Sequence, residues 1–150
     1  MRVLTNMEVW RFWTFRAVPA NAIRMADASY ACVDRDFAEG SLWDYTARAF
    51  GAAGLDHWSP DWDCDDFTRA YCAMAQWSHF RAQESAGRML AEAPALWEMW
   101  VMSMQHAIVA GVRQDEEGDL QPFYLEPQPR AAMKRLELSQ EDLLSVSLIR

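Results

Sequence analysis

The longest apolar stretch of the chain runs from Ala95 to Val112. A helix that is apolar nearly all round is buried in a core or in a membrane. Glu98, Gln105 and His106 fall within this stretch and would be costly to place in hydrocarbon. The pattern therefore predicts a buried central helix over about 94–113, on which the large apolar residues recur three or four positions apart: Leu96, Trp97, Trp100, Val101, Met104, Ile108 and Val112.

Several shorter segments carry helix start signals. The sequence Thr5-Asn6-Met7-Glu8 has the form of a capping box and predicts a helix over about 6–16. The β-forming residues that follow it leave open a short strand near 8–16. Ser59-Pro60-Asp61 predicts the start of a helix that reaches about residue 83, and Ser139 is expected to cap the last helix.

Further helices are expected over 21–37, 41–51 and 129–137. Glycine and proline separate these segments, which is typical of short loops between helices. The sequence thus predicts an all-α fold, a single compact domain over residues 1–150 with about six or seven helices around the central apolar one.

The net charge of −8 is concentrated in two acidic groups. A protein that binds nucleic acid directly carries the opposite charge, so this function class is disfavoured. An acidic surface suits a protein partner with a basic face, or it serves only solubility. The first group is Asp56, Asp61, Asp63, Asp65 and Asp66, and the second is Asp115, Glu116, Glu117 and Asp119.

Two tryptophans, Trp58 and Trp62, flank the first acidic group. Arginine pairs with carboxylates and stacks on indole, so exposed tryptophans here would suit an arginine-rich partner. The alternative is that both tryptophans pack at the start of a helix. The sequence predicts a partner-binding surface made of the two acidic groups together with Trp58 and Trp62.

The same stretch offers candidate metal ligands. Asp61 and Asp65 would share a helix face, and His57 could fold back toward them. Carboxylates favour Mg²⁺, Mn²⁺ or Ca²⁺, whereas histidine favours Zn²⁺. The pattern lacks the spacing of an EF-hand, and acids are common at a helix N-terminus because of the macrodipole. No cofactor or metal is therefore assigned, and His57, Asp61 and Asp65 remain the candidates.

Nucleophile motifs are weak in this chain. Cys72 and His79 share one face of a predicted helix but lie two turns, or about 10 Å, apart, which is too far for direct proton transfer. His106 is expected to be buried and hydrogen-bonded to a neighbour. We assign no catalytic residue, and the sequence favours a non-enzymatic protein while leaving enzymatic activity open.

The three cysteines form no regular framework, which indicates a reducing compartment. The N-terminus lacks the apolar run of a secretory signal. We expect a cytoplasmic monomer or homodimer that neither enters a membrane nor binds nucleic acid directly.

In size and acidity the chain is similar to phage-encoded inhibitors of host defence, anti-CRISPR proteins included, in which acidic side chains act as a nucleic-acid mimic. Together with the absence of a catalytic signature, the localised negative charge and the tryptophans, this similarity of composition favours a protein-binding, inhibitory module. Two alternatives stay open. One is a small metal-dependent enzyme or metal sensor that uses His57, and the other is a helical subunit of a larger assembly that uses residues 143–149 as its interface.

Overall fold

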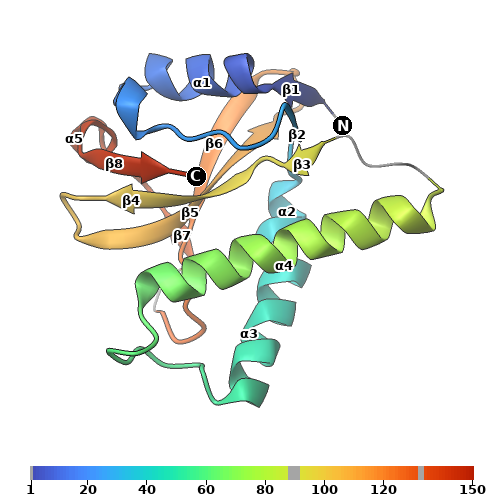
Figure 1. The fold of residues 1–150 in the computed structure, drawn as a ribbon, viewed down its shortest axis with the longest axis vertical. Coiled ribbons are helices and arrows are strands. Elements are labelled where there is room, and N and C mark those ends of the chain that lie inside the picture. The colour runs from blue at the N-terminus through green and yellow to red at the C-terminus, as the bar shows by residue number, and fades with distance from the viewer. Residues whose placement is uncertain (1, 88–91, 132–133) are drawn as a thin grey trace.

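The computed structural model describes residues 2–87, 92–131 and 134–150, which form two β-sheets with helices packed against them (Figure 1). The larger sheet has five antiparallel strands in the order β7-β6-β5-β4-β8. Their bounds are β4 Leu96–Val101, β5 His106–Gln114, β6 Leu120–Leu125, β7 Arg135–Leu136 and β8 Val146–Ile149.

The smaller sheet pairs β2 with β1 in antiparallel fashion and with β3 in parallel fashion. In Figure 1, α1 lies on one side of the strands, and α4 crosses on the other side and continues past the sheet. The remaining bounds are β1 Val3–Thr5, β2 Ser29–Ala31, β3 Ala93–Pro94, α1 Asn6–Phe15, η1 Ala20–Ala22, α2 Arg35–Phe37, η2 Ala38–Leu42, α3 Trp43–Ala53, α4 Cys64–Ser85 and α5 Gln140–Leu144.

The predicted central helix over 94–113 is wrong, and with it the all-α fold class. This stretch forms the antiparallel hairpin β4–β5, which turns at residues 102–105, where Gln105 has a φ of 50°. Met99, Val101, Ile108 and Val109 are fully buried. A strand covered on both faces needs no polar alternation, so its apolar run resembles that of a buried helix. The fold is mixed α/β.

The capping signals predict the termini of helices better than the apolar pattern does. Thr5 and Glu8 form the expected capping box of α1. The alternative of a short strand near 8–16 is wrong, because these residues lie in α1, and the strand of this region, β1, ends at Thr5 before the helix. Ser139 caps α5 as expected. The helix expected over 21–37 is wrong, since η1 and β2 lie there. The one expected over 129–137 is wrong as well, since strand β7 lies at Arg135–Leu136 and residues 129–131 are not helical, while residues 132–133 lie outside the described ranges.

The core fills both faces of the larger sheet, and its aromatic part lies between α1 and the strands. Trp13 of α1 is fully buried, and its ring centroid lies 6.2 Å from that of Trp97 on β4 and 6.3 Å from that of Tyr124 on β6. Gly111 on β5 leaves room for the ring of Phe123, because a Cβ at this glycine would lie 2.2 Å from the ring. The aromatic packing thus fixes the register of β5 against β6, and with it the position of the residues at the strand ends.

Within the described ranges, none of the helices combines the length and the apolar character needed to cross a lipid bilayer.

Candidate active site

Cys64 is the first residue of the 22-residue helix α4. The carboxylate of Asp63 accepts the N–H of Asp65 at 3.3 Å, and the N–H of Asp63 donates to Asp66 at 3.3 Å. This capping box, rather than Ser59-Pro60-Asp61, starts the helix. Since a helix N-terminus favours negative charge, it suits a cysteine that acts as a thiolate.

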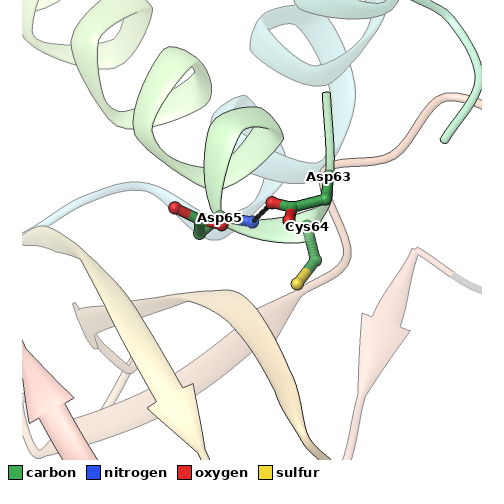
Figure 2. Close-up of side chains that lie close together, drawn as sticks. All are labelled: Asp63, Cys64 and Asp65. Atoms are coloured by element: carbon green, nitrogen blue, oxygen red, sulfur yellow. Dashed lines mark hydrogen bonds between the residues drawn. The ribbon is translucent and has the colours of Figure 1, made fainter. Parts of the chain in front are cut away.

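The sulfur of Cys64 lies against the larger sheet. The N–H of Ala107, the second residue of β5, donates to Cys64 Sγ at 3.5 Å. In Figure 2 the Cys64 sulfur points toward the strands, whereas the carboxylates of Asp63 and Asp65 lie along the first turn of the helix. The thiol therefore lies beside the peptide bond that joins His106 to Ala107.

His106 forms a hydrogen bond with a buried carboxylate. Its Nε2 lies 2.5 Å from Oε2 of Glu126, which is 6% exposed and follows directly after β6. The other carboxylate oxygen of Glu126 accepts the N–H of Gln128 at 3.1 Å. With Nε2–H donated to Glu126, the Nδ1 atom of the imidazole is left to accept a proton.

The backbone of Glu126 is held from two sides. The indole Nε1 of Trp43 on α3 donates to the carbonyl of Glu126 at 3.0 Å, and the N–H of Glu126 donates to the carbonyl of Lys134 at 2.8 Å. The Nζ of Lys134 in turn lies 3.8 Å from the centroid of the Trp43 ring. These contacts restrain the carboxylate that orients His106.

Burial raises the pKa of the Cys64 thiol above its ordinary value, and the negative charges of Asp63 and Glu126 act in the same direction. The N–H groups of Ala107 and of Cys64 itself stabilise the thiolate and partly oppose this shift. At neutral pH the resting group is therefore the thiol, and a neighbouring base must take its proton before the sulfur can attack a substrate.

The other two cysteines lie in different surroundings. Burial raises the pKa of the Cys32 thiol, and burial together with the charge of Glu98 raises that of Cys72 to about 12. Neither residue starts a helix, since Cys32 follows β2 and Cys72 lies inside α4. Both provide internal references for the reactivity of Cys64.

The acidic residues before α4 form local contacts. Asp56 accepts two hydrogen bonds from Arg130, at 3.0 and 2.6 Å, and its other carboxylate oxygen lies 3.2 Å from His57 Nδ1. Arg69 forms ion pairs with Asp65 and Asp66. Trp58 and Asp61 are exposed, as the partner-binding prediction requires. Trp62 instead packs against Phe50 and Phe67.

The second acidic group lies at the opposite end of β5 from Cys64. Asp115 accepts the N–H of Asp119 at 2.7 Å and the side chain of Gln121 at 3.0 Å, which closes the turn between β5 and β6. Glu116 and Glu117 are exposed on this turn. The structure thus does not bring the two acidic groups together, and whether either binds a partner stays a prediction.

The predicted metal ligands are not gathered. Among the described residues, ligand atoms within 4.8 Å of one another come from Asp63, Cys64 and Asp65, a set that includes neither His57 nor Asp61. Asp63 caps the helix and Asp65 pairs with Arg69. The aspartates of this cluster are therefore already engaged in helix capping and charge pairing.

No protein-family model matches the chain, and no curated protein matches its sequence. Solved structures, in contrast, do match the chain. The chain has the fold of part of a lectin from Polyporus squamosus. A structure of this lectin bound to the human-type influenza-binding epitope Neu5Aca2-6Galb1-4GlcNAc is similar with a TM-score of 0.65 at 18% identity, over 97% of this chain and 48% of the lectin chain. A structure described as a PSL1a-E64 complex gives a TM-score of 0.66 at 18% identity, over 97% of this chain and 49% of that chain.

The chain thus spans about half the length of the solved structures that it matches. The functional prediction is corrected, because an anti-CRISPR-like inhibitor was inferred from an acidic helical domain, whereas this chain has a mixed α/β fold similar to part of the Polyporus squamosus lectin. The two alternative functions are corrected as well. The helical subunit is not supported, because its expected interface, residues 143–149, is divided between α5 and the paired strand β8. The metal enzyme is not supported, because the described ligand atoms of His57, Asp61 and Asp65 are not gathered.

Sequence reasoning missed the combination of Cys64, His106 and Glu126. His106 was considered by itself as a buried, hydrogen-bonded histidine, and neither Cys64 nor Glu126 was assigned a role. These residues are far apart in the sequence, and only the packing of α4 on β5 and the pairing of β5 with β6 bring them together. The available local signal was an aspartate followed by a cysteine at a capping box.

Proposed function

We propose that the chain is a hydrolase with a cysteine nucleophile, in which Cys64 attacks, His106 transfers the proton and Glu126 orients His106. The observation that carries this proposal is the 2.5 Å contact between His106 and Glu126 beside a cysteine at the N-terminus of a long helix. A nucleophile, a base and a third group that orients the base are the parts that covalent catalysis requires.

In the proposed reaction, Nδ1 of His106 takes the proton of the Cys64 thiol, and the sulfur attacks the carbonyl carbon of an ester or peptide. A thioester forms, and the leaving group departs with the proton from His106. Water, deprotonated by His106, then attacks the thioester and releases the acid and the free thiol. The N–H of Cys64 donates to no oxygen among the described residues, so it is available to the carbonyl oxygen as negative charge develops there.

The first test is the selectivity of thiol alkylation. With limiting iodoacetamide at neutral pH, we expect Cys64 to react at least about tenfold faster than Cys32 and Cys72, because Cys64 lies beside the His106–Glu126 pair proposed to take its proton. Peptide mapping by mass spectrometry measures the three rates. E64, an epoxide whose ring is opened by thiolates, is the second alkylating reagent for the same comparison.

The matched variants are Cys64→Ala and Cys72→Ala. Hydrolysis of p-nitrophenyl acetate should disappear with Cys64→Ala and remain with Cys72→Ala. Equal alkylation of the three cysteines, together with unchanged hydrolysis by Cys64→Ala, would refute the proposed nucleophile.

Glycan binding is the second candidate function, favoured by the similarity to the Polyporus squamosus lectin. Because this chain spans about half of that lectin, the likeness leaves open which half holds the saccharide. Isothermal titration of the protein with the trisaccharide of that complex tests it. Saturable heat with a 1:1 endpoint would support this candidate, and the absence of heat at millimolar ligand would count against it.

We also propose a cytoplasmic location. The described residues contain three free cysteines, and a nucleophilic thiol must stay reduced to act.

A further inference from the structure

A buried threonine links the helix of the proposed nucleophile to the strand of the proposed base. Thr68 is fully buried in α4, one turn after Cys64. Its Oγ1 lies 2.7 Å from the carbonyl oxygen of Cys64 and 3.2 Å from that of Ala107. A threonine inside a helix commonly donates to the carbonyl four residues earlier. The two carbonyls share the single hydrogen of the hydroxyl, and the second acceptor, on β5, connects two different elements.

Both acceptors belong to the backbone of the site. One is the carbonyl of the nucleophilic residue, and the other is the carbonyl of the residue bonded to His106. A second contact joins the same two segments, since the Ala107 N–H donates to Cys64 Sγ. Thr68 and Cys64 therefore both contact the backbone of Ala107, one at its carbonyl oxygen and the other at its amide nitrogen. A shift of α4 along β5 would break both contacts.

We propose that Thr68 is a positioning residue whose hydroxyl fixes Cys64 relative to His106. This inference rests on the proposed function. Proton transfer requires heavy atoms within about 3 Å, and a displacement of about 1 Å can cost about a hundredfold in rate. Removal of the hydroxyl would leave the carbonyl of Ala107 with one donor fewer and allow the first turn of α4 to move relative to the strand.

The test compares Thr68→Val, which keeps the shape and removes the hydroxyl, with Thr68→Ser, which keeps the hydroxyl. The readout is the rate of Cys64 alkylation by iodoacetamide as a function of pH, with His106→Ala as the reference for an unassisted thiol. We expect Thr68→Val to lower the rate near pH 7 by about tenfold or more and to approach the reference profile. Thr68→Ser should stay within about threefold of the wild type.

A purely structural role predicts a different result, namely a lower unfolding temperature with an unchanged pH profile. A wild-type profile for a folded Thr68→Val would therefore overturn the inference. Should that variant fail to fold, Thr68→Ala replaces it, because it removes the hydroxyl without placing a methyl group against two carbonyls. If the wild-type protein itself follows the His106→Ala profile, the proposed function fails, and this inference fails with it.

Discussion

Replacing His106 by alanine is expected to lower the alkylation rate of Cys64 near pH 7 by about 10²–10⁴-fold. The thiolate is the reactive form, and burial raises the pKa of the Cys64 thiol above its ordinary value. Without a base, the thiolate fraction falls tenfold for each pH unit below that pKa. The rate in the variant should thus rise steadily with pH past the ordinary thiol range, whereas the wild type should keep its reactivity near neutrality.

Rates measured with iodoacetamide from about pH 5 to pH 10 provide this comparison. His79→Ala is the matched control, because His79 is a partly buried histidine on α4. Superimposable profiles for the wild type and His106→Ala would show that His106 does not assist Cys64.

Replacing Glu126 by glutamine should lower the turnover of p-nitrophenyl acetate by about 10²–10⁴-fold while the fold is retained. The amide has nearly the same shape as the carboxylate, but it is neutral and can donate to Nε2. A donor at Nε2 would favour the proton on Nδ1, the nitrogen that must accept the thiol proton. The variant would therefore hold the wrong tautomer and would no longer stabilise the imidazolium.

The control for this second substitution is Glu39→Gln, since Glu39 is also buried but forms ion pairs with Arg35 and Arg135. It measures the effect of losing a buried carboxylate elsewhere, and unfolding temperatures of both variants show whether stability is involved. Turnover by Glu126→Gln within about threefold of the wild type would contradict the proposed role.

The elements that could be predicted from the sequence are those defined by local chemistry. The capping boxes of α1 and α5 involve residues three apart, so the side chains that close them can be found in the sequence. The same reasoning placed the start of α4 too early, because Ser59-Pro60-Asp61 has the same form as a helix start. In the structure the backbones of Ser59 and Trp62 pair in a turn, and this pairing distinguishes Ser59-Pro60-Asp61 from a true helix start.

The hairpin β4–β5 could not be predicted in this way. Its apolar residues are buried by α1 on one side and α4 on the other, so no polar alternation marks it as a strand. The turn at 102–105 contains neither glycine nor proline. With this stretch taken as one helix, His106 lay in the middle of an element, whereas in the structure it begins a strand and faces Glu126.

The capping box at Asp63 has a consequence for engineering. Since Asp63 and Asp66 define the first turn of α4 and Thr68 joins that turn to β5, the placement of Cys64 does not depend on the length of the loop before it. That loop, residues 54–62, lies largely at the surface. Insertions between His57 and Trp58, which are both exposed, should be tolerated, because they leave the contacts of Asp56 and Trp62 in place, so an affinity tag or a substrate-recruiting peptide can be added there without displacing the sulfur.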